Sequence, residues 1–385
     1  MKQRKAAASN ILEEAPPSCR GAVVCLPGER GYECSHERAT CFEVAKRLAV
    51  LKGFDAVWEY DAATRYPGPV YFLPSDTLVG VEAANALGIR GEHDLFGGVV
   101  PSSVVGTKAI THPLVGPDAE APAGWSRDFG HRVQDVVLSG FSAFTFRDAR
   151  RAGMRLLEHG PVRVKRVQET GGRGQTVVFD AAGLEAVLEA VDPAELAQCG
   201  LVLEENLADV TTYSVGQVRV ADLVASYHGT QRLTPDNGGA PVYGGSELVV
   251  VRGEFDAMPG LGLAEEVRLA VMQGRAYDAA ASQCFPELFA SRRNYDVAQG
   301  LDQRGRRRSG VLEQSWRIGG ASSAEIAALE AFRADPLLRA VRAICIEAYG
   351  ESEVPPPNAT VYFRGVDERV GFITKYTLVE PYGDT

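Results

Sequence analysis

The chain alternates between short apolar runs and segments whose apolar residues recur at helical spacing. Residues 21–26 form an apolar run, and residues 37–52 follow with apolar positions three or four apart. The runs at 55–60 and 69–73 predict two further strands, and residues 77–87 predict a second helix. Strands that alternate with helices are typical of a parallel sheet with helices on its faces. We therefore expect an N-terminal α/β unit.

A different pattern surrounds Lys165. This lysine lies in a run of alternating apolar and polar side chains, and a second β-rich run follows at 175–178. Between the two runs, Gly171, Gly172 and Gly174 interrupt regular structure, which predicts a hairpin. Glycines adopt φ > 0 and leave backbone N–H groups uncovered, so such a turn can close over phosphates. An ordinary hairpin with a loose tip is the plain alternative.

The remaining pattern mixes loops, helices and strands. Residues 117–135 are polar and contain proline and glycine, which predicts a loop. Helical spacing predicts helices at 262–282 and 323–348, and residues 359–379 predict two strands. The segment 323–379 carries no motif, which leaves open whether it completes a third subdomain or forms the interface of a homodimer.

Carboxylates and an arginine are concentrated in a second predicted hairpin. Side chains alternate faces along a strand, so Glu313, Ser315 and Arg317 share one face. Asn294 and Asp296 share a face of the partner strand in the same way. One carboxylate from each strand, an oxygen donor beside each and a nearby cation suit a Mg²⁺–phosphate site. A charged hairpin that faces solvent is the plain alternative.

Composition and charge narrow the classes of function. The chain has 385 residues, which favours two or three subdomains, and its net charge is −10. An acidic chain is a poor binder of nucleic acid or of anionic membranes. The seven cysteines include no CxxC pair, and no apolar run reaches the length of a membrane span. We therefore expect a cytoplasmic protein that binds neither nucleic acid nor membrane.

The order of these motifs resembles the ATP-grasp superfamily, which includes biotin carboxylase and D-alanine–D-alanine ligase. The order is an α/β unit, an isolated lysine, a lysine-bearing strand with a glycine hairpin, an apolar strand that ends Glu-Glu-Asn-Leu, and the carboxylate hairpin. The resemblance covers roughly residues 20–320. The chain also resembles a bacterial branch of the superfamily, and that resemblance implies no particular reaction. It implies an ATP-grasp fold of mixed α/β and α+β class.

The resemblance also implies a division of the chain. It places a parallel α/β domain at 19–105, and the polar N-terminal sequence before that domain predicts a disordered tail at 1–18. A small glycine-hairpin lid subdomain with the hinge would occupy 106–205, and a catalytic subdomain with a mixed sheet would occupy 206–385.

Residue roles follow from the same resemblance, with ATP and Mg²⁺ as the implied cofactors. The positions that would bind the nucleotide are Lys108, Lys165, Gly171, Gly172, Gly174, Glu204, Glu205 and Leu207. The positions that would hold the metal are Asp296, Glu313 and Ser315. Arg317 would face the acyl-phosphate and its attacking nucleophile. His36 and Glu37 would lie where related ligases bind the amine or amino-acid substrate.

Three features depart from the family pattern. Ser315 stands where the family has asparagine. The segment after the hinge reads Thr-Thr-Tyr-Ser-Val at 211–215 and lacks the usual arginine and glutamate, so Asp209 becomes the candidate for the ribose-binding acid. The separation between Asp296 and Glu313 is also longer than in many relatives because an arginine-rich loop lies between them.

Three functions follow as hypotheses. The first is an ATP-dependent ligase that joins a small carboxylate to an amine or another nucleophile through an acyl-phosphate. The second is a non-catalytic ATP- or ADP-binding protein with a regulatory or interaction role, which the departures at Ser315 and Thr212 motivate. The third, a Rossmann dehydrogenase, is weaker because the glycines join two strands and lack the G-x-G-x-x-G spacing.

Overall fold

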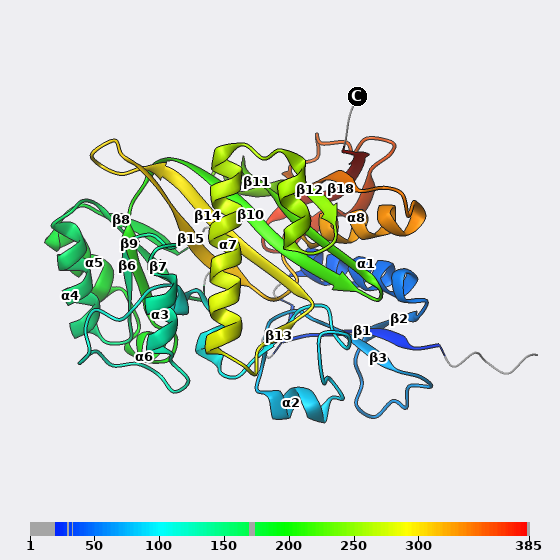
Figure 1. Ribbon diagram of the computed structural model, residues 1–385, viewed down its shortest axis with the longest axis horizontal. Coiled ribbons are helices and arrows are strands. Elements are labelled where there is room, and N and C mark those ends of the chain that lie inside the picture. The colour runs from blue at the N-terminus through cyan, green and yellow to red at the C-terminus, as the bar shows by residue number, and fades with distance from the viewer. Residues whose placement is uncertain (1–19, 29–30, 33, 169–173, 383–385) are drawn as a thin grey trace, which may run out of the picture.

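Three principal sheets follow one another along the chain in a computed structural model that describes residues 20–28, 31–32, 34–168 and 174–382 (Figure 1). A three-stranded parallel sheet comes first, a four-stranded antiparallel sheet second and an eight-stranded antiparallel sheet third. This order confirms the fold class predicted from the sequence. Every strand pair described in the eight-stranded sheet is antiparallel, whereas the prediction was a mixed sheet.

The N-terminal sheet has the order β2-β1-β3. Its strands are β1 (Ala22–Leu26), β2 (Asp55–Glu59) and β3 (Val70–Pro74), and α1 (Ser35–Lys52) connects the first two. The central strand β1 is almost wholly buried because it has a neighbour on each side and α1 on one face. The apolar run and the helical spacing therefore correspond to a buried strand and its crossover helix, as predicted.

A small sheet joins the N-terminal region to the rest of the molecule. Its order is β13-β5-β4, with β4 (Leu78–Val79), β5 (Gly98–Val100) and β13 (Phe289–Ala290). The residues at 77–87, predicted as one helix, contain β4 followed by α2 (Val81–Ala86). Gly80 stands between the two with a φ of 89°, a conformation that glycine adopts without strain.

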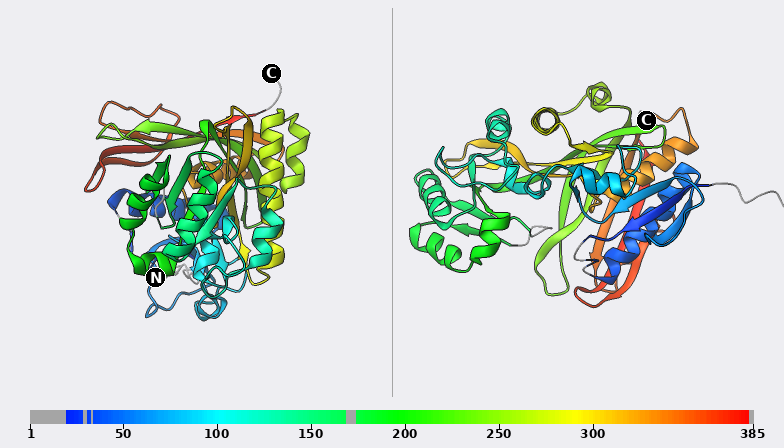
Figure 2. Two further views of the ribbon diagram at one scale, coloured as in Figure 1. Left: turned by 90° about the vertical axis from the view of Figure 1, so that its left-hand side faces the viewer. Right: turned by 90° about the horizontal axis from the view of Figure 1, so that it is seen from below.

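The four-stranded sheet and its helices form a separate lobe at one end of the molecule (Figures 1 and 2). Its order is β6-β9-β7-β8. The strands are β6 (Gly140–Ala143), β7 (Val162–Arg166), β8 (Gln175–Val178) and β9 (Leu201–Glu205). The predicted hairpin is formed by β7 and β8.

The eight-stranded sheet has the order β15-β14-β10-β11-β12-β16-β18-β17. Its strands are β10 (Ala208–Val220), β11 (Leu223–Pro235), β12 (Pro241–Arg252), β14 (Arg292–Leu301), β15 (Arg307–Ser315), β16 (Ala340–Tyr349), β17 (Thr360–Asp367) and β18 (Gly371–Pro381). The carboxylate hairpin, β14 and β15, lies at the end of this strand order. It therefore meets the segments that follow the N-terminal unit, including a β-bridge between Val137 and Val311.

Helices cover the sheets, and none in the described part of the chain combines the length and apolar character required to cross a membrane. The remaining α-helices are α3 (Arg127–Val133), α4 (Phe146–Leu157), α5 (Ala181–Glu189), α6 (Pro193–Cys199), α7 (Glu265–Cys284) and α8 (Ser322–Ala334). The 3-10 helices are η1 (Ser103–Gly106), η2 (Lys108–Thr111) and η3 (Phe255–Leu261).

Two further predicted elements, besides the helix at 77–87, were wrong in part. The loop predicted at 117–135 contains α3, which Ser126 caps by accepting a hydrogen bond from the backbone of Phe129. The single helix predicted at 323–348 ends with α8, and β16 follows. Asp335 precedes a proline and is extended, with a φ of −127°, because a residue before proline disfavours the helical conformation.

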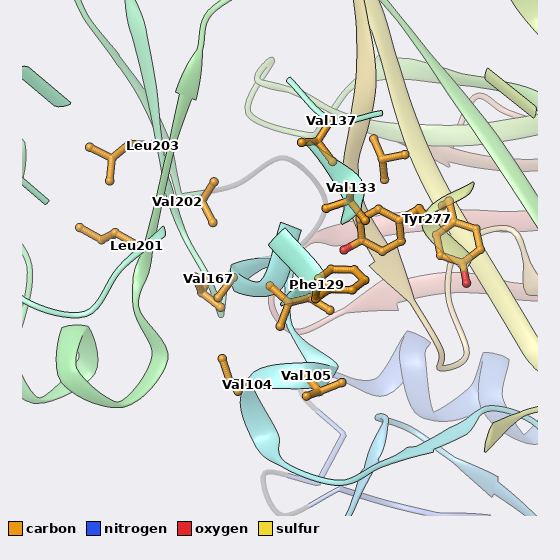
Figure 3. Packing of buried hydrophobic residues seen from close by; sticks show 14 of the residues in the cluster. Val104, Val105, Phe129, Val133, Val137, Val167, Leu201, Val202, Leu203 and Tyr277 are labelled. Carbon is orange, nitrogen blue, oxygen red and sulfur yellow. The ribbon is translucent and has the colours of Figure 1, made fainter. Parts of the chain in front are cut away.

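Apolar side chains from several elements form the core beside the four-stranded sheet (Figure 3). Leu201 and Leu203 point to one face of β9 and Val202 to the other, toward Phe129 of α3. Tyr277 of α7 packs edge-on against Phe129. Since faces alternate along a strand, Glu204 shares its face with Val202, which directs that carboxylate away from the outer helices.

Candidate functional site

A buried trio of ionisable groups lies on the inner face of the four-stranded sheet. Lys165 Nζ is 2.5 Å from Glu204 Oε1, and His112 Nε2 is 3.1 Å from Glu204 Oε2. Strand pairing explains the contact between Lys165 and Glu204. Lys165 of β7 lies opposite Val202 of β9, and Glu204, two residues further along β9, points to the same face as Val202. Burial alone would raise the pKa of Glu204, but the charge of Lys165 and the hydrogen bond with His112 outweigh it and lower that pKa to about 2. The carboxylate is therefore ionised at neutral pH.

A second lysine reaches the carboxylate hairpin from the N-terminal side. Lys108 is the first residue of η2, and its Nζ lies 2.7 Å from Glu313 Oε2. Gln314, the next residue on β15, donates hydrogen bonds to the carbonyls of Val105 and Thr107 at 3.0 and 2.8 Å. These two bonds hold the backbone before η2 against β15, which sets the position of Lys108.

The two predicted metal-binding carboxylates lie directly opposite each other. Asp296 of β14 pairs with Glu313 of β15, and Asn294 pairs with Ser315. Burial and the negative charge of Glu313 raise the pKa of Asp296. Asp296 Oδ1 accepts hydrogen bonds from Asn294 Nδ2 at 2.8 Å and from Ser214 Oγ at 3.3 Å. Two facing carboxylates with oxygen-bearing neighbours form a donor set suited to a hard divalent cation.

Positively charged side chains from different elements lower the pKa of Glu313. Burial would raise the pKa of Glu313, but the adjacent Lys108 ammonium and the charges of Lys165 and Arg317 lower it. The predicted site residues on η2, β7 and the end of β15 therefore face a common region. Arg317 donates to the carbonyl of Ile318 at 2.8 Å, and its Nε lies 3.8 Å from Asp76 Oδ1.

Ser315 accepts a hydrogen bond from the buried side chain of Arg292. Arg292 Nη1 donates to Ser315 Oγ at 3.1 Å and to the carbonyl of Arg317 at 2.7 Å. The same guanidinium forms an ion pair with Glu325 of α8, with Nη2 to Oε1 at 2.8 Å. A positive group beside Ser315 Oγ opposes the approach of a metal ion, so its role as a metal ligand stays a prediction.

The hinge between the two large sheets is held by ion pairs and apolar contacts. Glu205 accepts hydrogen bonds from Arg308 Nη2 at 2.9 Å and from Arg308 Nε at 3.1 Å. Its carboxylate also accepts from the backbone N–H of Ser139 at 2.9 Å. Leu207 is buried with Leu138 and Ala298, and Leu312 packs against this cluster. The hinge residues and the carboxylate hairpin therefore share an apolar contact.

The predicted substrate residues lie at the start of α1. His36 is buried, and its Nδ1 lies 3.1 Å from Asp367 Oδ2 at the turn between β17 and β18. Asp367 also accepts from the backbone N–H of His36 at 3.0 Å and from Ser35 Oγ at 2.9 Å. Asp367 thus caps the N-terminus of α1 from another element. Glu37 is exposed in the first turn of the helix, and a substrate role for either residue stays a prediction.

Parts of the predicted phosphate loop fall outside the described residues. Gly171 and Gly172 belong to that segment. Gly174 is described, has a φ of 63° and accepts a hydrogen bond from the backbone of Arg166 at 3.0 Å. Asp209, the candidate ribose acid, is exposed and has a φ of 50° at an irregularity in the pairing of β10 with β14.

Sequence reasoning missed three residues that complete this site. His112 bonds to Glu204, Arg292 bonds to Ser315, and Asp76 lies near Arg317. The position of Asp76 just after β3, at the carboxyl end of a parallel strand, was a usable signal because ligands bind at that edge of α/β sheets. His112 and Arg292 gave no such signal, since their partners are distant in sequence.

Comparison with models of protein families identifies the family to which the chain belongs. A family model described as "Protein of unknown function (DUF3182)" matches residues 24–377, and the chain belongs to that family. A comparison with curated proteins gives no match.

Solved structures with a similar chain path include several ligases. Carboxyaminoimidazole ribonucleotide synthase from Aspergillus clavatus, complexed with ATP, has 13% identity, covers 94% of each chain and has a TM-score of 0.49. Biotin carboxylase from Campylobacter jejuni has 11% identity, covers 94% of this chain and 87% of its own, and has a TM-score of 0.49. D-alanine–D-alanine ligase from Bacillus anthracis has 11% identity, covers 78% and 87%, and has a TM-score of 0.41. Both enzymes named in the sequence-based resemblance are thus among the matches.

Proposed function

We propose that the protein is an ATP-dependent ligase that activates a small carboxylate as an acyl-phosphate and joins it to an amine or another nucleophile. The observation that carries this proposal is the convergence on Glu313. Lys108 contacts that carboxylate, Asp296 lies opposite it, and the charges of Lys165 and Arg317 act on it. Facing carboxylates among lysines and an arginine suit a magnesium nucleotide and a phosphoryl group.

The donor set fits a magnesium ion. Mg²⁺ prefers oxygen ligands and is commonly held by one or two carboxylates together with substrate phosphates and water. Asp296 and Glu313 supply the two carboxylates, and neither strand offers a competing thiolate or imidazole at the paired positions. The ion, when bound, would neutralise charge on the phosphates. Asp296 and Glu313 would hold the ion between them, and Lys108 would then be released from its contact with Glu313.

The two lysines would bind and orient the nucleotide. Lys108 lies beside the carboxylate hairpin, so it would reach a phosphate once a metal ion takes over the charge of Glu313. Lys165 is held by Glu204, which keeps its ammonium at a fixed place on the inner face of the four-stranded sheet. The apolar cluster around Leu207 and Leu312 would accommodate the flat face of the adenine ring.

The proposed reaction has two steps. A carboxylate oxygen of the substrate attacks the γ-phosphorus, the bond to the β-γ bridging oxygen breaks, and ADP leaves. The nucleophile then attacks the carbonyl carbon, inorganic phosphate leaves, and the nucleophile loses a proton. Arg317 would stabilise negative charge on the transferred phosphoryl group and on the carbonyl oxygen. Phosphoryl transfer depends chiefly on positioning and charge neutralisation, for which these residue types are suited.

The test is ADP release from Mg·ATP with a panel of small carboxylates and amines. We expect release that requires one member of each class, and we expect Glu313→Gln to abolish it. Calorimetry with Mg·ADP on the same preparations measures binding separately. Tight binding without turnover on any pair would favour the second candidate, a non-catalytic nucleotide-binding protein, for which the engagement of Ser315 by Arg292 is the supporting observation.

A further inference from the structure

A thiol, an imidazole and a carboxylate come together at the N-terminal end of α1. They belong to Cys34, His36 and Asp367, and all three residues are buried. Cys34 Sγ lies 3.3 Å from His36 Nδ1, and the same Nδ1 lies 3.1 Å from Asp367 Oδ2. Asp367 is the last residue of β17 and is 331 positions away from His36 in the sequence. The fold therefore gathers three kinds of metal ligand from the two ends of the chain.

Hydrogen bonds account for only part of this arrangement. A neutral imidazole carries one N–H group. The Asp367 carboxylate is the nearer and stronger acceptor, so Nδ1–H donates to it. The Cys34 thiol then lies beside a nitrogen that has no lone pair to offer, and Nε2, the other ring nitrogen, is 3.8 Å from Sγ. A metal ion in place of the proton would be shared by all three groups.

Backbone groups hold Asp367 in the orientation of a ligand. Its Oδ1 accepts hydrogen bonds from the N–H groups of Arg369 at 2.9 Å and Val370 at 3.2 Å, and its Oδ2 accepts from the N–H of His36 at 3.0 Å. Such partners around a metal ligand fix its position and strengthen binding. Lys375, whose charge acts on His36, lies 2.9 Å from Glu347, which balances that charge. A cation bound here would therefore meet a preoriented anion.

The donor types and their spacing favour zinc. Zn²⁺ is bound by cysteine sulfur at about 2.3 Å, by histidine nitrogen at about 2.0–2.1 Å and by aspartate oxygen at about 2.0–2.2 Å. In a tetrahedron these lengths place the ligand atoms about 3.3–3.6 Å apart, close to the observed 3.3 and 3.1 Å. The three atoms lie within 4.8 Å of one another, so a small movement of the Cys34 side chain would bring Sγ to the carboxylate. Mg²⁺ prefers oxygen ligands and does not select a thiolate.

We propose that Cys34, His36 and Asp367 form a zinc site that connects the start of α1 to the turn between β17 and β18. Binding transfers the thiol proton to solvent and moves the ring proton of His36 to Nε2. Three protein ligands leave a fourth position, which water or a donor atom of a substrate takes. The zinc site is separate from the carboxylates of β14 and β15 and does not rest on the proposed function.

The test uses Co²⁺ as a probe, because a bond between cobalt and a thiolate gives a charge-transfer absorption in the near ultraviolet. Co²⁺ is titrated into chelator-treated protein without nucleotide, and Zn²⁺ is then added to displace it. We expect one Co²⁺ per chain with this absorption. Cys34→Ser should abolish the absorption, and His36→Gln should weaken Zn²⁺ binding by more than about 100-fold, because outer-shell partners alone contribute about 10–100-fold. Cys199→Ser, which changes a buried thiol at the end of α6, should keep both properties.

Two of the variants guard against a folding defect. Cys34 is the N-cap residue of α1 and serine is a preferred N-cap, so Cys34→Ser should fold normally. Asp367→Asn keeps the size of the side chain and one acceptor oxygen for α1, and its Zn²⁺ affinity should fall about tenfold or more. Circular dichroism verifies the fold of each variant. The inference is overturned if the wild-type protein shows no thiolate absorption with Co²⁺, if Cys34→Ser retains it, or if His36→Gln binds Zn²⁺ as tightly as the wild type.

Discussion

Lys165 and Glu204 form an ion pair of 2.5 Å whose side chains are only 5% and 2% exposed. Removing one partner of a buried pair leaves an uncompensated charge, which costs about 3–5 kcal/mol. We therefore predict that Lys165→Met lowers the free energy of unfolding by that amount and that Lys165→Met with Glu204→Gln restores part of it. Calorimetric unfolding measures both. Lys46→Met, which breaks an exposed pair with Glu43, should cost less than about 1 kcal/mol.

Stability should also depend on pH through Glu204. Its pKa falls from a usual value of 4.5 to about 2 in the folded protein, where Lys165 and His112 oppose the effect of burial. A lowered folded-state pKa gives stability that is complete above the unfolded value and disappears as the pH falls toward the folded value. We predict a loss of about 3 kcal/mol between pH 4.5 and pH 2 from this group. Denaturant unfolding at several pH values should show a smaller acid dependence in Glu204→Gln; an equal dependence would contradict the assignment.

The facing carboxylates of Asp296 and Glu313 should lower the stability of the metal-free protein, and they should also be needed for the binding of a metal ion. Asp296 and Glu313 lie directly opposite each other, and like charges at such positions destabilise by about 0.2–1 kcal/mol. Asp296→Asn should therefore raise the melting temperature slightly in metal-free buffer. Mg²⁺ with ADP should raise the melting temperature of the wild-type protein but not of this variant. Asp222→Asn, at an exposed carboxylate paired with Arg333, serves as the control and should keep the response to Mg²⁺.

Local patterns predicted the carboxylate hairpin because its geometry depends on strand periodicity. Alternation of faces placed Asn294 with Asp296 and Glu313 with Ser315, and the strand pairing confirms both sets. The approach of Lys108 to Glu313 depends instead on the hydrogen bonds of Gln314 to η1 and the residue before η2. No periodicity in the sequence reports such a contact, because it arises from the packing of distant segments.

The difference between local sequence pattern and contacts of distant segments also explains why the single helix predicted at 323–348 was wrong in part. Its first half is α8, whose apolar residues follow helical spacing. The second half, β16, alternates buried and half-buried residues over part of its length, and its alanines and glutamate are good helix formers. Its strand state follows from pairing with β12 and β18 on both sides. Tertiary contacts thus override local propensity there.

The capping of α1 gives a prediction that separates structure from function. Asp367 accepts hydrogen bonds from His36 N, Ser35 Oγ and the backbone N–H of Arg369. Loss of a helix cap costs about 0.5–2 kcal/mol, so Asp367→Ala should destabilise the protein by that amount. Glu368→Ala, which removes a more exposed acceptor for Ser35, should cost less. Calorimetry should find the affinity for Mg·ADP unchanged in Asp367→Ala; a large loss would instead connect this turn to the nucleotide site.

The contact between Arg308 and Glu205 links the eight-stranded sheet to the four-stranded one and gives the last prediction. The guanidinium spans both carboxylate oxygens, a geometry that lysine cannot reproduce. Both Arg308→Met and Arg308→Lys should weaken ADP binding by about three- to tenfold, since a lost charge-assisted hydrogen bond is worth roughly 1 kcal/mol or more. Arg306→Met, in the loop just before β15 and paired only with Asp302 of that loop among the contacts described, should have no effect. If the two sheets are coupled through this contact, Glu205→Gln added to Arg308→Met will cause little further loss; additive losses in the calorimetric affinities would mean that the two residues act on the nucleotide separately.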